Sequence, residues 1–318
     1  MQAASRLAHR IPGHGQPVLA AQWHPRPGAA RLATGSGDGT ARVWDANTGT
    51  PHRTLAGHSG WVLGVAWSPD GERLATCSMD KTVRVWEDLD GAAGEKGKDK
   101  KDKVSVLSGH AKWVLALAWE PFHLWRDGTP RLASASKDGT VRVWVVNTGR
   151  TEHVLSGHKG SVSSVKWGAG GEDGTGLIYT GSHDKSIKVW DAAKGTLVHT
   201  LAAHAHWVNH LALSTDFALR TGFFDYTKGD VPATEEDRRN RAKERFEKAA
   251  KIQGKVAERL VSASDDCQIY LWQPMDGTKP LAKMLGHQKQ VNHVTFSPDG
   301  TLIASTGFDN HTKLWNAR

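Results

Sequence analysis

Apolar and polar residues alternate in six short segments of this chain, and each segment ends in tryptophan. A period of two places successive side chains on opposite faces of a strand, and the small and β-branched residues before each tryptophan suit a strand. The segments are TARVW, TVRVW, TVRVW, SIKVW, QIYLW and HTKLW, which end at Trp44, Trp86, Trp144, Trp190, Trp272 and Trp315. The pattern therefore predicts six β-strands in equivalent surroundings.

Polar residues recur at constant positions before these tryptophans. An aspartate stands six residues before each tryptophan, a serine or threonine stands four residues before the aspartate, and a histidine lies further upstream, five times within Gly-His. The six sets are His14, Thr34, Asp38 and Trp44; His58, Thr76, Asp80 and Trp86; His110, Ser134, Asp138 and Trp144; His158, Thr180, Asp184 and Trp190; His204, Ser262, Asp266 and Trp272; and His287, Ser305, Asp309 and Trp315. This spacing is the signature of WD repeats.

The signature predicts an all-β WD40 β-propeller, in which each repeat builds a four-stranded blade. Buried polar groups are stable only when they bond to one another, so each set is interpreted as a buried hydrogen-bond relay that holds the turn between the second and third strands. We expect one domain over residues 1–318, with six recognisable repeats ending near residues 45, 87, 145, 191, 273 and 316.

Insertions interrupt the repeats and are all expected on one face of the propeller. They are a Lys-rich loop at 91–103, the stretches 121–130 and 168–176, and a charged helical insertion at 214–259 in the fifth repeat. In the longest insertion Thr234 is a suitable N-cap, acidic residues follow it, and Gly254 is a suitable end. Three interpretations of the basic residues stay open: a solvated face, docking of a partner or contacts to RNA phosphates. The candidate RNA contacts are Lys98, Lys100, Lys101, Arg238, Arg239 and Arg241.

The opposite face carries candidate partner-binding residues, which we call the rim. Three of them are tryptophans that stand three residues after a relay histidine, and four stand immediately before a relay aspartate. The rim comprises Trp61, Met79, Trp113, Lys137, His183, Trp207 and Phe308. Exposed aromatic residues are common interaction anchors. Packing of the tryptophans between blades is the alternative.

Two chemical hypotheses compete with a purely structural role for the relay residues. Thr76, His58 and Asp80 have the residue types of a nucleophilic triad. However, a catalytic site occurs once in a domain and this set occurs six times. His204, His206 and His210 suggest zinc, but His204 belongs to a relay and no fourth ligand is evident. We therefore expect no catalytic, cofactor-binding or metal site, and no enzyme.

Composition narrows the class of partner. The 318 residues include 41 Lys and Arg against 33 Asp and Glu, which gives a formal net charge of +8 and favours anionic partners. The two cysteines, Cys77 and Cys267, lie far apart in sequence and indicate a reducing compartment rather than a disulfide framework. Neither a signal peptide nor a membrane-spanning apolar run is evident, so we expect an intracellular protein without membrane partners.

Several stretches resemble the Notchless family of WD-repeat ribosome assembly factors. They are HWVNHLALSTDFALRTGFFDY (206–226), the charged insertion that follows, SASDDCQIYLWQP (262–274) and KMLGHQKQVNHVTFSPDG (283–300). The resemblance implies a nuclear and nucleolar scaffold on the pre-60S ribosomal particle, touching ribosomal RNA and other assembly factors. It also implies an N-terminal ubiquitin-like domain that couples to the Midasin AAA ATPase, and eight repeats.

The chain departs from this family pattern in two ways. Its first repeat begins within the first dozen residues and its sixth ends at the last residues. We therefore expect it to lack the ubiquitin-like domain and the last two repeats, and not to engage Midasin. Six blades either close, with residues 5–10 as the outer strand of the last blade, or leave open strand edges. A peptide-recognition adaptor in ubiquitin ligation or signalling is the alternative to a ribosome assembly scaffold.

Overall fold

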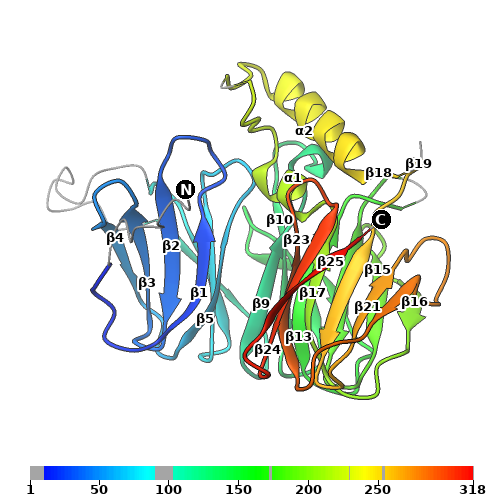
Figure 1. The fold of residues 1–318 in the computed structure, drawn as a ribbon. Helices are drawn as coiled ribbons and strands as arrows, with labels where there is room; N and C mark the ends of the chain where they lie inside the picture. The colour runs from blue at the N-terminus through cyan, green and yellow to red at the C-terminus, as the bar shows by residue number, and fades with distance from the viewer. Residues whose placement is uncertain (1–10, 90–102, 172–173, 229, 253–254, 318) are drawn as a thin grey trace, which may run out of the picture.

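The computed structural model describes residues 11–89, 103–171, 174–228, 230–252 and 255–317. Within these ranges six antiparallel sheets of three or four strands follow one another in chain order, and their strands pair in sequence order, with a separate two-stranded sheet inserted in the fifth. The sheets stand side by side as blades (Figure 1). The prediction of an all-β propeller is confirmed.

The strands of the blades are as follows. Blades 1 to 3 consist of β1 (Val18–Trp23), β2 (Arg31–Ser36), β3 (Thr40–Asp45) and β4 (Thr50–Ala56); β5 (Val62–Trp67), β6 (Leu74–Ser78), β7 (Thr82–Trp86) and β8 (Val104–Ser108); and β9 (Val114–Trp119), β10 (Arg131–Ser136), β11 (Val141–Val145) and β12 (Arg150–Leu155). Blades 4 to 6 consist of β13 (Val162–Gly168), β14 (Leu177–Ser182), β15 (Ile187–Asp191) and β16 (Leu197–Leu201); β17 (Val208–Leu213), β20 (Leu260–Ser264), β21 (Ile269–Trp272) and β22 (Ala282–Met284); and β23 (Val291–Phe296), β24 (Leu302–Gly307) and β25 (Thr312–Asn316).

The hydrophobic core lies between neighbouring blades rather than inside any one of them. Val43 and Leu55 of blade 1 pack with Trp67 and Trp86 of blade 2 in one buried cluster. Equivalent clusters join each following pair of blades. Each fully buried large side chain contributes about 1.5–3 kcal/mol, so a blade depends on its neighbours for most of its stability.

The described blades form an open ring. Inner strands contact one another in succession from β1 to β5, β9, β13, β17 and β23, but no comparable contact joins β23 back to β1 among the described residues. Apolar side chains are exposed at both sides of this opening, including Trp23 (54%) of blade 1 and Leu314 (70%) of blade 6. Residues 5–10, expected as an outer strand if six blades close, lie outside the described residues.

Insertions from blades 3 and 5 pack together into a small second core, which we call the platform. It consists of the 3-10 helix η1 (Phe122–Leu124) and the helices α1 (Asp216–Thr221) and α2 (Glu235–Ala250), which lie across one end of the sheets (Figure 1). Its buried residues are Phe122, Trp125, Phe223, Phe224 and Ala242. Helices in the described residues are too short or too polar to cross a membrane.

Helix α2 begins where its sequence predicts and ends earlier. Thr234 is the N-cap, and its hydroxyl accepts a hydrogen bond from the Asp237 N–H at 3.1 Å. The end expected at Gly254 is wrong, because the helix stops at Ala250 and the chain enters the short hairpin of β18 (Lys251–Ile252) and β19 (Lys255–Val256). Ala250 is fully buried, so the helix stops at its last contact with the core of blades 4 and 5.

Replacing Phe223 by alanine is expected to undock α2 from the blades. The side chain is buried against Phe122 and Phe224, and removal of a buried phenylalanine costs about 3–5 kcal/mol. Hydrogen exchange of residues 235–250 should accelerate while the inner strands keep their protection. Phe308→Ala is the matched control, because Phe308 is 60% exposed. Unchanged exchange of α2 in the Phe223 variant would contradict the packing role.

Candidate functional site: a rim above six buried relays

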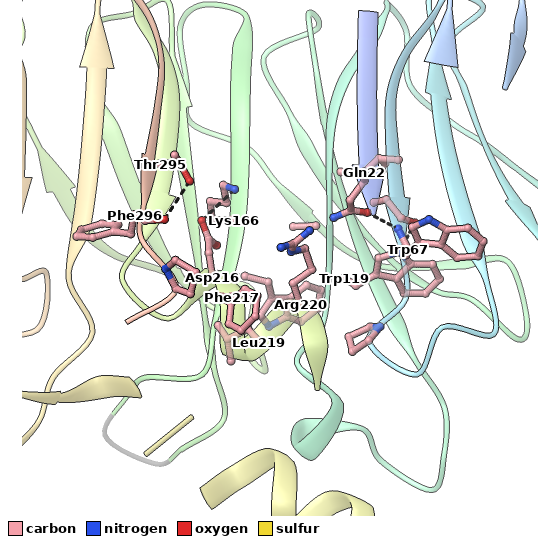
Figure 2. Close-up of a pocket in the computed structure, with 16 residues that line it drawn as sticks. Gln22, Trp67, Trp119, Lys166, Asp216, Phe217, Leu219, Arg220, Thr295 and Phe296 are labelled. Atoms are coloured by element: carbon pink, nitrogen blue, oxygen red, sulfur yellow. Dashed lines mark hydrogen bonds and ion pairs between the residues drawn. The ribbon is translucent and has the colours of Figure 1, made fainter. Parts of the chain in front are cut away.

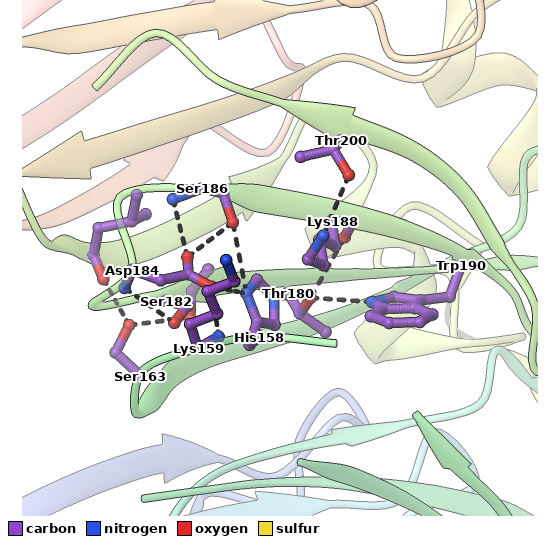
Figure 3. Close-up of polar contacts among 12 residues, drawn as sticks. His158, Lys159, Ser163, Thr180, Ser182, Asp184, Ser186, Lys188, Trp190 and Thr200 are labelled. Atoms are coloured by element: carbon purple, nitrogen blue, oxygen red, sulfur yellow. Dashed lines mark hydrogen bonds and ion pairs between the residues drawn. The ribbon is translucent and has the colours of Figure 1, made fainter. Parts of the chain in front are cut away.

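The relay of blade 4 shows how each predicted set is arranged (Figure 3). Trp190 Nε1–H donates to the Thr180 hydroxyl at 2.9 Å, and that hydroxyl lies 2.8 Å from His158 Nε2. His158 Nδ1 lies 2.8 Å from Asp184 Oδ2. If Nδ1–H donates to the carboxylate, Nε2 is free to accept the threonine proton. Each hydrogen-bonding group of the relay then has a partner.

The same contacts occur in all six blades. The distance from histidine Nδ1 to aspartate Oδ2 lies between 2.7 and 2.9 Å in every case. The distance from histidine Nε2 to the hydroxyl oxygen is 2.8 Å in each blade. The structure thus brings together all of the predicted relay residues, and spacing alone was sufficient to find them.

Each relay aspartate also holds a strained turn. Oδ1 of Asp80 accepts the N–H of Thr82 at 2.9 Å, and Oδ2 accepts the N–H of Ser59 at 3.1 Å. The residue after the aspartate has positive φ in every blade, although only two of the six are glycine: Gly39, Lys81, Gly139, Lys185, Cys267 and Asn310. Left-handed backbone costs a non-glycine residue about 1–2 kcal/mol. The aspartate bonds offset that cost.

Electrostatics keep the relay in one protonation state. Burial opposes ionisation of Asp184, but hydrogen bonds from Ser186 and His158 outweigh it and hold the pKa at about 2. Burial lowers the pKa of His58, His110 and His158 despite their aspartate partners. The relays of blades 2 to 4 therefore pair a neutral imidazole with a carboxylate at neutral pH.

Thr76, His58 and Asp80 do meet with the connectivity of a nucleophilic triad. The Thr76 hydroxyl, however, is fully buried and accepts a hydrogen bond from Trp86 Nε1 at 3.0 Å. A nucleophile must be reached by substrate and must have a free lone pair aimed at it. The geometry of Thr76, His58 and Asp80 is therefore that of a structural hydrogen-bond relay.

The three histidines of HAHWVNH are separated in the structure. His204 is in its relay, His206 Nδ1 lies 3.5 Å from Asp265 Oδ2, and His210 Nδ1 lies 3.0 Å from the Val294 carbonyl oxygen. Among the residues with described coordinates, no three His, Cys, Asp or Glu side chains are arranged to hold a metal ion.

The rim tryptophans are exposed on turns that the relays hold. Trp61, Trp113 and Trp207 are 48%, 39% and 44% exposed. The carbonyl of Trp61 accepts the N–H of Met79 at 3.0 Å, and that of Trp113 accepts the N–H of Lys137 at 2.9 Å. Packing entirely between blades would have buried these indoles, so large aromatic faces remain available to a partner.

Local stacking restrains two of the three indoles. Lys137 Nζ lies 4.1 Å from the ring centroid of Trp113. His183 stacks on Trp207 with centroids 4.4 Å apart and planes at 6°. A restrained side chain loses less entropy on binding, which favours an anchor. His206 and Asp265 also belong to this surface and were missed, although Asp265 stands in the same position before its relay aspartate as Met79 or Lys137.

The arginines proposed as RNA contacts have acceptors within the protein. Arg238 Nε donates to the Pro232 carbonyl at 2.8 Å, and its guanidinium lies over the Phe223 ring. Arg239 bonds Glu235 at 3.0 Å, and Arg241 makes two bonds to the Asp230 carboxylate at 3.1 and 3.0 Å. These side chains hold the platform together. Lys98, Lys100 and Lys101 lie outside the described residues.

These features define the class of protein. The model of the WD domain, G-beta repeat matches residues 5–45, 49–87, 101–145, 149–191 and 278–316, and the chain belongs to this WD-repeat family. The three inner strands of the fifth blade, whose repeat carries the long insertion, fall between the last two matches.

Individual proteins of known name also match the chain over most or all of its length. The chain is 69% identical to Ribosome assembly protein 4 of Chaetomium thermophilum over 319 residues, which cover all of this chain and 59% of the relative. It is 48% identical to Ribosome assembly protein 4 of Saccharomyces cerevisiae over the same shares. It is 42% identical to Protein Notchless of Drosophila melanogaster, over 94% of this chain and 58% of the relative. The resemblance to Notchless is confirmed, and the chain spans about three fifths of the length of these relatives.

Removing one relay hydroxyl is expected to destabilise the fold. In Ser134→Ala the buried Trp144 N–H loses its acceptor and His110 Nε2 loses its donor, at about 1–3 kcal/mol for each unpaired group. The urea midpoint should fall, whereas Ser108→Ala, an exposed serine at the end of β8, should leave it nearly unchanged. Equal midpoints for the two variants would refute the relay's contribution.

Acid sensitivity is expected to fall when His123 is replaced by phenylalanine. Burial, aided by the charge of Lys243, lowers the pKa of His123 to about 4, and the ring stacks on Phe246. The unfolded state takes up this proton near pH 6.5 and the folded state near pH 4, so stability is lost as pH falls between these values. At pH 5 the loss is on the order of 1–2 kcal/mol. The stability difference between pH 8 and pH 5 should shrink in His123→Phe, and an unchanged difference would exclude this contribution.

Proposed function

We propose that this chain is the propeller of a non-catalytic scaffold for assembly of the large ribosomal subunit, and that it docks on pre-60S ribosomal particles in the nucleus and nucleolus. The names of its relatives support the process, because two are ribosome assembly proteins. The observation that supports docking is the row of exposed tryptophans on turns held by buried relays.

The rim is the proposed partner-binding surface. Large aromatic side chains contribute much of the binding energy at protein interfaces and lose little conformational entropy when already restrained. Trp113 and Trp207 are restrained by Lys137 and His183. Phe308, which is 60% exposed, adds apolar area to the rim. This combination suits an extended protein segment of an assembly factor.

RNA of the particle is the second proposed partner of this chain. The net charge of +8 draws the chain toward a polyanion. The proposed RNA contacts are Lys98, Lys100, Lys101, Arg238, Arg239 and Arg241, of which the three arginines also donate to acceptors within the platform. Coupling to the Midasin ATPase belongs to the ubiquitin-like domain in the Notchless resemblance, so it is proposed only for a protein that carries that domain.

Alanine at Trp61, Trp113 and Trp207 together is expected to weaken binding to purified pre-60S particles at least about tenfold, since interface tryptophans often contribute 2 kcal/mol or more each. Sedimentation with particles measures the effect, and circular dichroism verifies folding. Trp23→Ala is the matched control, because Trp23 is 54% exposed away from the rim.

Three outcomes are distinguishable in this experiment. Loss of particle binding in the triple variant alone supports the proposal. Full particle binding by a folded triple variant contradicts the role of the rim. If the wild-type chain does not bind particles but binds short peptides through the three tryptophans, the result would favour the alternative function of an adaptor in ubiquitin ligation or signalling.

A further inference from the structure

A cavity of about 350 Å³ lies at the centre of the ring, between the inner strands and α1. Five of the blades contribute inner-strand or adjacent residues to its wall, and the insertion of blade 5 contributes α1. Figure 2 shows Arg220 of α1 reaching between Lys166 and Asp216 on one side and Gln22 and Trp67 on the other. The rim and the relays do not use this cavity.

Two polar side chains beside Arg220 have partners within the cavity wall or next to it. Asp216 Oδ2 accepts the Leu213 N–H at 3.0 Å and pairs with Lys166 Nζ at 3.2 Å. Gln22 Oε1 accepts the backbone N–H of Trp67.

Arg220 is the exception among the arginines of the blade 5 insertion. Arg238, Arg239, Arg241 and Arg245 each donate to a carbonyl, hydroxyl or carboxylate oxygen of the same insertion. Arg220 has only the ring of Phe217, 5.9 Å from its guanidinium, and no acceptor among the residues that the structure describes. A guanidinium has five N–H donors and remains charged at any physiological pH. A guanidinium that faces a cavity and has no acceptor is suited to binding an anion.

The charges of the wall select the kind of anion. Lys166 already pairs with Asp216, so Arg220 is the one unneutralised cation among the cavity residues that the structure describes. A dianionic phosphate would need further cations, whereas a singly charged carboxylate matches one guanidinium. We propose that Arg220 binds a carboxylate of a partner peptide in this central cavity.

The proposal is tested with three peptides that differ only in their carboxylate. One is acetyl-Gly-Glu-Leu-Gly-amide, the second replaces glutamate by glutamine, and the third is the glutamine peptide with a free C-terminus. Saturation-transfer NMR on the purified chain gives the dissociation constants. We expect one or both carboxylate peptides to bind about tenfold more tightly than the neutral peptide, and the tighter one identifies a side-chain or C-terminal source.

Variants locate the binding. Arg220→Gln should weaken carboxylate binding about tenfold, Arg220→Lys should weaken it less, and Arg150→Gln, which removes a charge from the exposed end of β12, should leave it unchanged. Equal binding of all three peptides, or unchanged binding by Arg220→Gln, would overturn the proposal. Tighter binding of inorganic phosphate than of either carboxylate would overturn the choice of carboxylate. Because Arg220 is outside the rim, failure here leaves docking through the tryptophans untouched.

Discussion

One hydrogen-bonded relay, from indole to hydroxyl to imidazole to carboxylate, determines the local geometry of every blade. The two ends of the relay lie in different surroundings. The indole end is buried in the core between blades, as Trp144 is with Leu132 and Leu107, whereas the carboxylate end fixes a turn whose next residue has left-handed backbone. Because each donor has one acceptor, the turn cannot shift without unpairing groups in the core. In each blade the geometry of the surface turn is therefore coupled to the packing of the hydrophobic core.

In blades 1 to 3 an arginine beside the relay tryptophan leaves room only for glycine before the relay histidine. A Cβ at Gly57 would lie 2.5 Å from the guanidinium of Arg84, and a Cβ at Gly109 would lie 2.9 Å from that of Arg142. In blade 5 alanine precedes the histidine, and Tyr270 takes the place of the arginine, with its ring edge-on to His204 at 4.7 Å.

Repetition made the relays and the fold predictable, whereas contacts that occur once were not. Six equal sets identify the turns and thereby place the rim, since its members stand next to relay residues. Nothing in a single charge run reveals that Arg241 faces Asp230, or that Phe122 of blade 3 meets Phe223 of blade 5. Arg220 escaped notice for the same reason, because only the cavity shows that it lacks an acceptor. Propensity predicted the start of α2 through Thr234, but tertiary packing set its end.

The blade 5 insertion changes how stability is distributed in an open ring. Blades that touch only their neighbours form a nearly linear array, and such an array can open at any interface. The insertion makes contacts beyond its neighbours: Tyr226 Oη donates to the Pro25 carbonyl of blade 1 at 3.0 Å, and a Cβ at Gly222 would lie 2.9 Å from the Pro69 oxygen of blade 2. Toward blade 4, Tyr179 donates to the Glu258 carboxyl at 3.0 Å, and burial raises the pKa of that carboxyl. A strap of this kind couples distant blades, so the positions of the rim tryptophans on blades 2, 3 and 5 depend on contacts made at the opposite end of the sheets.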